Sequence, residues 1–433
     1  MTLDGRSGRR LTATVTDLEV ERQRALLVGV ALPNHDLSEA ERSLSELALL
    51  TDTAGSDPVE SELIRRQKPD PATFIGRGQA DQLAELSRAL DIDVVVFDND
   101  LTPAQQRNLH KLFRCDVVDR IAVILDIFAQ HATSREGMIQ VELALLKYHL
   151  PRLKGKGTEL SRLGGGIGTR GPGETKLESD RRRILTRISK LERQLKGLAA
   201  TRDTQRKSRR RSDLPLVSLV GYTNAGKSTL LNQMTDAGVL TEDRLFSTLG
   251  STVRKADLPN GETILLSDTV GFVRRLPHML VEAFRSTLEE IADAHLLVHV
   301  VDGADHAAET QILAVHEVLG DIGATDIDEL IVFNKLDIAD PVGIARLAAL
   351  HPEAVFVSAL TGEGIEDLGD AIGRRLAGQL EDVKLMIPYE RGDVLAAVHR
   401  DGVILSEEHV DEGTRLRARL RPSQASQLAG FIE

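Results

Sequence analysis

One glycine-rich segment constrains this chain more than any other feature. GYTNAGKST runs from Gly221 to Thr229 and fits the pattern G-x-x-x-x-G-K-[ST]. An apolar run precedes the segment and LLNQM, a helical pattern, follows it, which is the strand–loop–helix context that a phosphate-binding loop requires. The segment therefore predicts a nucleotide-binding α/β domain.

Each residue type in this segment suits phosphate chemistry. Gly221 and Gly226 permit the tight turn, and main-chain N–H groups at the helix N-terminus cradle the phosphates. We expect Lys227 to reach the β- and γ-phosphates and the Ser228 hydroxyl to coordinate Mg²⁺. The expected nucleotide contacts of the loop are Gly221, Tyr222, Thr223, Asn224, Ala225, Gly226, Lys227, Ser228 and Thr229.

A second motif follows in the expected order. LLSDTVGF places Asp268 at the end of a predicted strand, 41 residues after Lys227. Asp268 is positioned to hold Mg²⁺ through a water molecule, and the Gly271 N–H to meet the γ-phosphate. Thr269 and Val270 are the other expected nucleotide contacts in this segment.

Two further segments predict which base of the nucleotide is recognised. IVFNKLD places Asn334, Lys335, Leu336 and Asp337 after a strand. The Asp337 carboxylate can accept hydrogen bonds from guanine N1–H and N2–H₂, a donor pair that adenine lacks, and the Lys335 stem can cover the base. Main-chain N–H groups of Ser358, Ala359 and Leu360 can bind guanine O6. Together the motifs predict a GTPase.

A mobile threonine should complete the metal site between the phosphate loop and Asp268. LFSTLGSTVRK offers Thr248 and Thr252, and we prefer Thr248 because Ser251–Lys255 must already lead into the next strand. The metal ligands are then Ser228, Thr248 and Asp268, and the catalytic residues Lys227, Thr248 and Gly271. The expected nucleotide contacts here are Phe246, Ser247, Thr248, Leu249 and Gly250.

Apolar periodicity predicts an α/β multidomain chain. Strands at 25–32 and 93–97 alternate with helices at 37–50 and 101–113, which indicates a parallel N-terminal sheet. The GTPase domain should have a mostly parallel sheet with strands near 216–220, 263–267, 296–301, 330–333 and 354–357. The predicted domains are a disordered tail (1–21), an N-terminal α/β domain (22–125), a helical hairpin with a basic linker (126–213), the GTPase domain (214–380) and a small C-terminal α/β domain (381–433).

The helical hairpin is predicted from a heptad-like stripe. Leu177, Ile184, Ile188, Leu191, Leu195 and Leu198 recur at spacings of 7, 4, 3, 4 and 3. Two antiparallel helices with a glycine-rich tip at 164–173 satisfy this pattern, and the charged segment 202–213 would then be a linker. A plain linker is the alternative interpretation of the glycine-rich stretch.

Charge is unevenly distributed. The chain carries −12 overall, which by itself argues against a nucleic-acid partner. Residues 147–213, however, hold 20 Lys and Arg against 7 Asp and Glu, a balance of +13, so the remainder carries −25. One strongly basic segment in an acidic chain indicates a localised polyanion contact, and a solvated charged face is the alternative.

Other features exclude several classes of protein. A single cysteine, Cys115, rules out an internal disulfide framework and fits a reducing cytosol. We find no signal-peptide pattern and no apolar run of about 20 residues, so we expect a cytoplasmic monomer without a membrane span. The 12 histidines show no metal-ligand spacing, and we assign them no role.

The order of these parts resembles the HflX family of ribosome-associated GTPases over about residues 25–430. Beyond the GTPase motifs, the resemblance rests on FIGRGQADQL (74–83), NDLTPAQQRNL (99–109), LDIFAQHATSREG (125–137), QVELALLKYHLPRL (140–153) and GGGIGTRGPGETKLESDRR (164–182). The last segment is long, unusual and highly specific.

The resemblance implies a function that the motifs alone do not. Members bind GTP or GDP with Mg²⁺, associate with the 50S ribosomal subunit and, in the GTP state, split stalled 70S ribosomes. The tip is implied to contact ribosomal RNA, and a ribosome-bound protein would be peripheral at the membrane. The expected RNA-contacting residues are Gly164, Gly165, Gly166, Arg170, Gly171, Gly173 and Lys176.

Two details of the resemblance concern metal ions. Thr248 falls on the family's switch threonine, but the family commonly has L-D-P-T-T-R where this chain has residues 249–254 as LGSTVR, which puts Thr252 in doubt as a ligand. Asn224 matches the P-loop asparagine of potassium-activated GTPases, which indicates stimulation by K⁺. An asparagine that only braces the loop is the alternative.

Two other function classes remain open from the sequence. One is a GTPase that remodels RNA or helps ribosome assembly, with weak ATP use in the N-terminal domain. The other is a small-molecule enzyme powered by GTP, which lacks any second catalytic constellation in this sequence.

Overall fold

The computed structural model describes residues 22–33, 36–153, 172–211, 214–235, 245–246, 252–274, 288, 291–420, 424–425 and 428–433. The chain falls into two compact units that divide between Ile124 and Leu125. No helix among the described residues is long and apolar enough to cross a membrane.

The first unit is built on a four-stranded parallel sheet in the order β2-β1-β3-β4. Its central strand β1 has seven consecutive buried residues, as expected for a parallel strand covered on both faces. The elements are β1 (Gln23–Ala31), α1 (Leu37–Thr53), β2 (Ser56–Arg65), α2 (Arg77–Ala89), β3 (Val94–Phe97), α3 (Pro103–Phe113) and β4 (Asp116–Asp119). The expected parallel sheet is confirmed, although β2 and β4 had not been foreseen.

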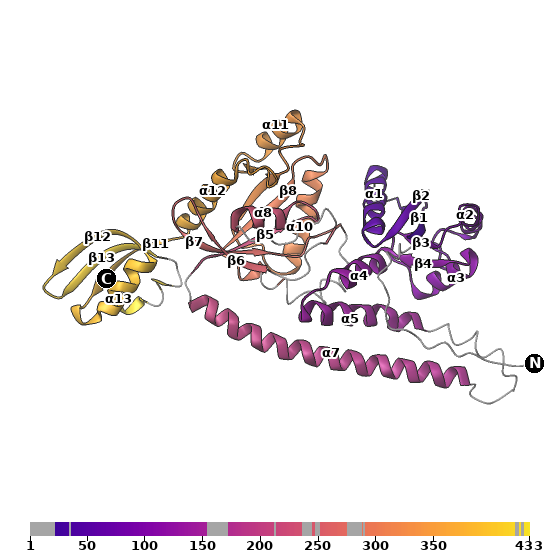
Figure 1. The fold of residues 1–433 in the computed structure, drawn as a ribbon, viewed down its shortest axis with the longest axis horizontal. Helices are drawn as coiled ribbons and strands as arrows, with labels where there is room; N and C mark the ends of the chain where they lie inside the picture. The colour runs from indigo at the N-terminus through magenta and orange to yellow at the C-terminus, as the bar shows by residue number, and fades with distance from the viewer. Residues whose placement is uncertain are drawn as a thin grey trace, which may run out of the picture. The chain divides into compact units, whose positions relative to one another are not determined.

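Helix α4 (Arg120–His131) leads from this unit to a pair of long helices. These are α5 (Arg135–His149), continued by the short 3-10 helix η1 (Leu150–Leu153), and α7 (Pro172–Arg211), and Figure 1 shows the pair as antiparallel. The expected stripe lies at their interface, where Ile188 and Leu191 of α7 pack with Ile139 and Leu143 of α5. Leu177 lies in α7, but its side chain is outside the described part of the chain.

Two details of this region differ from the sequence-based expectation. The segment at 202–211, expected to be a charged linker, is helical and forms the last turns of α7. Arg, Lys and Gln are good helix formers, so a run of them extends a helix rather than ending it. In addition, α7 begins at Pro172, so Gly173 and Lys176 belong to a helix and not to a glycine-rich tip.

The nucleotide-binding domain is a six-stranded sheet in the order β10-β9-β8-β5-β7-β6. All neighbours are parallel except the edge strand β6, which pairs antiparallel with β7. The elements are β5 (Leu216–Gly221), α8 (Lys227–Thr235), β6 (Thr252–Asp257), β7 (Thr263–Asp268), β8 (Leu296–Asp302), α10 (Ala308–Asp321), β9 (Glu329–Asn334), α11 (Pro341–Leu350), β10 (Val355–Phe356) and α12 (Ile365–Gly378). The mostly parallel sheet is confirmed.

The C-terminal part is a three-stranded antiparallel sheet, ordered β11-β13-β12, with one helix against it. Its elements are β11 (Glu381–Ile387), η2 (Tyr389–Arg391), α13 (Gly392–Asp401), β12 (Val403–Val410), β13 (Gly413–Leu420) and η3 (Ala429–Phe431). Strand β13 alternates buried and exposed residues, so only one face of this sheet carries a core.

The helix pair supplies the first prediction. Leu191 is fully buried between α5 and α7, so Leu191→Ala should destabilise their packing by about 2–5 kcal/mol. Hydrogen exchange should accelerate in peptides covering 139–150 and 184–198. Leu185→Ala is the matched control, because Leu185 lies on the same helix and is 43% exposed. Equal exchange in the two variants would contradict the packing described here.

Candidate GTP-binding site

The phosphate-binding loop joins the end of β5 to the start of α8. Asn224 and Gly226 both have a left-handed backbone, with φ of 60° and 93°. A Cβ on Gly226 would lie 2.2 Å from the Asn334 side-chain nitrogen, so only glycine fits there. The loop therefore turns tightly and lies directly against Asn334, the last residue of β9.

Lys227 is buried beneath this loop. Its Nζ donates hydrogen bonds to the main-chain carbonyls of Gly221 at 3.0 Å and Tyr222 at 2.8 Å. Burial lowers the pKa of Lys227 to about 8, and the nearby Asp268 carboxylate opposes that shift. The lysine is thus held in position by its own loop, with an ammonium group that is easily deprotonated.

Two hard oxygen donors converge beside Lys227. Asp268 is the last residue of β7 and fully buried, and the Ser228 hydroxyl donates to its Oδ2 at 2.6 Å. Oxygen ligands of this kind are those that Mg²⁺ prefers, so the pair fits a magnesium site. Gly271 is equally constrained, since a Cβ there would lie 2.8 Å from Thr223 Cγ2 and 3.2 Å from Lys227 Nζ.

Phe272 joins the segment after β7 to the phosphate loop. Its N–H donates to the Gly221 carbonyl at 3.1 Å, and its carbonyl accepts from the Thr223 N–H at 2.7 Å. The Phe272 ring is fully buried, so this position presents no polar side chain to a nucleotide. The two main-chain bonds fix the spacing between the Asp268 segment and the loop.

The segments expected to bind guanine are held together by Asn334, the last residue of β9. Its Nδ2 donates to the Ala225 carbonyl at 2.9 Å, and its Oδ1 accepts from the Ala359 N–H at 2.8 Å. One buried amide therefore connects the phosphate loop with the loop after β10. Sequence reasoning gave Asn334 only a place in the base-binding motif and missed this connection.

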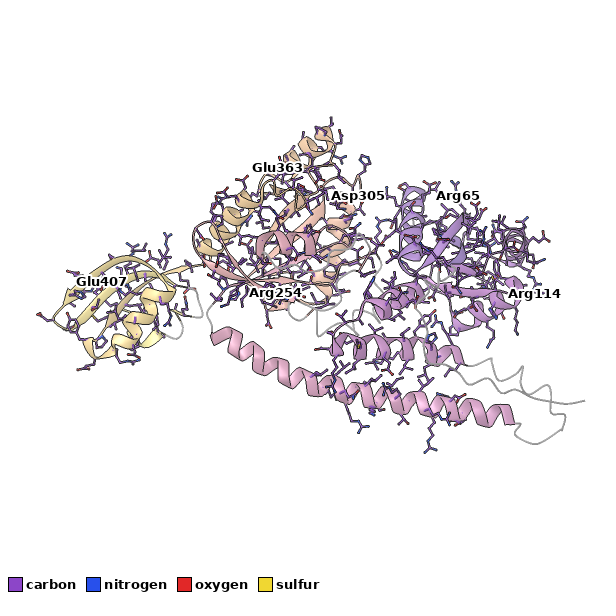
Figure 2. The ribbon with its side chains drawn as sticks, viewed as in Figure 1. Arg65, Arg114, Arg254, Asp305, Glu363 and Glu407 are labelled. Atoms are coloured by element: carbon purple, nitrogen blue, oxygen red, sulfur yellow. The ribbon has the colours of Figure 1, made fainter. Side chains whose placement is uncertain are left out.

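Asp337 and Lys335 have separate partners. The Ser358 hydroxyl donates to Asp337 Oδ1 at 2.6 Å, while the Lys335 ammonium pairs with Asp302 Oδ2 at 2.7 Å. The Ser358 N–H in turn donates to the carbonyl of Glu363, which Figure 2 labels, at 2.9 Å. Asp302 ends β8 and was not foreseen, because no linear motif marks it.

The switch segment is only partly within the described structure. Phe246 is buried and forms an edge-to-face contact with Phe128 of α4, with ring centroids 4.7 Å apart. Thr252 is the first residue of β6 and pairs with Asp268, as the preference for Thr248 had assumed. The expected contacts Ser247, Thr248, Leu249 and Gly250 lie outside the described residues, as do Gly164, Gly165, Gly166, Arg170 and Gly171.

Other expected nucleotide contacts follow strands β5, β7 and β10 of this sheet. Thr269, Val270 and Ala359 are buried, while Leu360 is 76% exposed. The Thr269 hydroxyl donates to the Leu219 carbonyl at 2.7 Å, so this side chain braces β5. Tyr222 is buried, and its hydroxyl accepts from the Arg274 N–H at 2.6 Å.

A mostly parallel sheet with a phosphate loop, a D-x-x-G segment and an N-K-x-D segment at one edge defines a P-loop GTPase. Models of known families cover most of this chain. They are described as GTP-binding GTPase N-terminal (41–129), GTP-binding GTPase Middle Region (131–209), 50S ribosome-binding GTPase (216–335) and HflX C-terminal domain (343–430).

Curated relatives agree with these models. A protein named GTPase HflX from Lacrimispora saccharolytica is 43% identical over 408 residues, which cover 94% of this chain and 96% of the relative. GTPase HflX from Magnetococcus marinus is 44% identical, covering 95% of each chain, and that from Escherichia coli K12 is 44% identical, covering 86% and 88%. The chain belongs to the HflX family of GTPases.

Base specificity should depend on Asp337. In Asp337→Asn the retained oxygen still accepts from Ser358, but a donor replaces the second acceptor for guanine. GTP affinity should fall at least about tenfold, since unpaired buried groups cost roughly 1–3 kcal/mol. Xanthosine triphosphate, with an oxygen at position 2 of the base, should bind the variant better than GTP does.

Equilibrium titration with both nucleotides measures this effect. Asp340→Asn is the control, because Asp340 caps α11 and asparagine caps a helix equally well. Unchanged GTP affinity in Asp337→Asn would sink the assignment of this carboxylate to guanine.

Lys227 makes GTP binding sensitive to pH. A group with a pKa of about 8 is half neutral at pH 8, and bound phosphates would raise that pKa. We therefore expect about half a proton to be taken up per GTP at pH 8, and about a tenth at pH 7. Calorimetry in two buffers of different ionisation enthalpy measures the uptake. Zero uptake at pH 8 would contradict a lowered pKa of Lys227 that bound phosphates raise.

Proposed function

We propose that this chain binds the 50S ribosomal subunit in a GTP-dependent way and splits stalled 70S ribosomes. The description of the matching GTPase model, 50S ribosome-binding GTPase, supports the binding step. The observation within this chain that carries the proposal is the basic helix α7. Its apolar stripe faces α5, and its opposite side presents cations to solvent.

The exposed side chains of α7 suit a phosphate backbone better than single bases. Arg181, Arg182 and Arg183 are exposed in succession, and Lys190 and Arg193 follow on the same helix. Arg187 is paired with Glu142 through two hydrogen bonds of 2.6 Å, and Arg183 lies 3.6 Å from the Asp180 carboxylate. Clustered cations without interleaved aromatics contact phosphates rather than stack on bases.

At the nucleotide, we propose that Ser228, Thr248 and Asp268 hold Mg²⁺, with Asp268 acting through a water molecule. The 2.6 Å approach of Ser228 to Asp268 supports this assignment. Bound magnesium would neutralise charge on the β- and γ-phosphates. Lys227 and the Gly271 N–H would contact the γ-phosphate, and Asp337 with Ser358, Ala359 and Leu360 the guanine.

Intrinsic hydrolysis should be slow. Many GTPases carry a glutamine after the D-x-x-G motif to orient the attacking water, and here that residue is Phe272, which is fully buried. The water must be oriented by other groups, and we propose that ribosome binding orders them. The expected result is low turnover alone and a clear increase with 50S subunits.

Potassium stimulation is proposed from Asn224. This residue is exposed at the phosphate loop and has a left-handed backbone, and it stands at the position of the potassium-linked asparagine. GTP turnover should be higher in KCl than in NaCl at equal ionic strength, and Asn224→Ala should abolish the difference. Equal GTP turnover in the two salts would indicate that Asn224 only braces the phosphate loop.

Ribosome splitting should depend on the segment between the helices. Replacing 164–171 with serine leaves α7 to begin at Pro172 and should leave GTP affinity unchanged, because the described nucleotide site lies elsewhere. The 50S-stimulated GTPase rate and the splitting rate, followed by light scattering, should both fall at least about tenfold. A variant that splits 70S ribosomes at the normal rate would contradict the proposed role.

The basic face of α7 tests the RNA contact separately. Charge reversal of Arg181, Arg182 and Arg183 should weaken 50S binding and flatten its salt dependence, by about 0.7–0.9 in log–log slope for each lost contact. Arg346→Glu, an exposed arginine on α11, is the control. Stimulation by naked RNA equal to that by 50S subunits would instead favour an RNA-remodelling factor.

A further inference from the structure

Three potential metal ligands meet on the GTPase domain. His299 lies in β8, His316 in α10, and Glu329 is the first residue of β9. Their ligating atoms all lie within 4.8 Å of one another, and no other group of three such residues does so within the described parts of the chain. None of the three belongs to the nucleotide site.

The carboxylate lies between the two imidazoles. Glu329 Oε1 is 2.6 Å from His299 Nδ1 and 3.0 Å from His316 Nε2, and Glu329 Oε2 is 2.9 Å from His316 Nε2. Ligand atoms around a tetrahedral zinc ion, at about 2.0–2.2 Å from the metal, are separated by roughly 3.3 Å. Small side-chain adjustments therefore convert this cluster into a coordination site.

The pKa shifts of two members of the cluster have opposing causes. Burial lowers the pKa of His299 and the hydrogen bond to Glu329 raises it, with a net downward shift. Burial raises the pKa of Glu329, but the two histidines lower this pKa by more, so its net shift is downward. A neutral imidazole and an ionised carboxylate are the forms that bind metal ions.

The cluster is reached from one side. His299 is 1% exposed, whereas the side chains of Glu329 and His316 are 24% and 43% exposed. Both exposed partners line a cavity of about 330 Å³, together with Leu297 and Leu319. A cation can therefore enter without disturbing the sheet, and a water molecule has space to complete its coordination.

We propose that His299, His316 and Glu329 form a binding site for a transition-metal cation of the Zn²⁺ type. Two imidazole nitrogens and one carboxylate oxygen would hold the ion, with the fourth position open to the cavity. The bound ion would join β8, α10 and β9. Because His299 is paired in register with Val220, the ion would stabilise the strand beside the phosphate loop.

The same set of side chains is unsuited to Ca²⁺ and Mg²⁺. Ca²⁺ and Mg²⁺ prefer oxygen ligands and seldom accept two imidazoles, so they should compete poorly for this cluster. The rival explanation is a hydrogen-bonded trio in which the Glu329 carboxylate accepts hydrogen bonds from N–H groups of both rings. The rival predicts no metal affinity above that of scattered surface histidines.

The test is zinc titration of the tag-free, nucleotide-free full chain, followed by competition with a chromophoric chelator. We expect one Zn²⁺ per chain with micromolar or tighter affinity. His316→Ala should weaken it at least about 100-fold, because even residues that only orient a metal ligand are worth about 10–100-fold. His316 is partly exposed, so this change should not unfold the domain.

His351→Ala is the matched control. His351 also pairs with a glutamate, its Nε2 lying 2.9 Å from Glu309 Oε1, but no third His, Cys, Asp or Glu of the described chain joins this pair in a potential metal site. Zinc affinity should be unchanged in this variant, and zinc should raise the melting temperature of the wild type and of His351→Ala but not of His316→Ala. GTP affinity, measured in all three proteins without zinc, reports that the nucleotide site is intact.

Cobalt supplies an independent readout. Co²⁺ at a three-ligand site with one water should give the visible absorption of a four-coordinate ion, and Glu329→Gln should abolish it. Equal zinc affinity in the wild type and His316→Ala, or no site tighter than about 10 µM in the wild type, would overturn the proposal.

Discussion

The nucleotide site depends on the side-chain amide of Asn334. Its two hydrogen bonds reach the phosphate loop at Ala225 and the loop after β10 at Ala359. Leaving either buried partner unpaired would cost roughly 1–3 kcal/mol, so the amide holds both loops in one arrangement. The glycine at 226 follows from the same contact, because any side chain there would displace the amide. The phosphate loop and the loop after β10 are therefore coupled before a nucleotide arrives.

The sequence predicted the buried parts of the fold well. Strands β5, β7, β8 and β9 are continuous apolar runs, since they are covered on both faces, and such runs are easily recognised. Several strands at sheet edges were missed or only inferred, although the edge strand β10 was predicted at 354–357. β2 and β12 carry mostly exposed, polar residues, and their pairing depends on neighbours distant in the chain. The charged end of α7 was mistaken for a linker because charge was weighed above helix propensity.

The residues of the site, like the strands, were only partly predictable from the sequence. Those within contiguous motifs, such as Lys227 and Asp268, could be identified from the motifs and their spacing. These two residues lie 41 positions apart in the sequence, and the structure brings them side by side. Contacts between motifs could not be identified. The Asn334 bridge and the edge-to-face pair of Phe246 with Phe128 join residues that share no local pattern. The cluster of His299, His316 and Glu329 was not predicted for the same reason, because its residues come from three separate elements.

Hydrogen exchange of the nucleotide-free protein tests the coupling of the two loops most directly. The account predicts that Asn334→Ala accelerates exchange at least about tenfold in peptides covering both 222–228 and 357–361, because each loop loses one buried hydrogen bond. Peptides of the N-terminal sheet should be unaffected and serve as the internal reference. Acceleration in only one of the two loops, or in neither, would contradict the claim that a single amide holds them together.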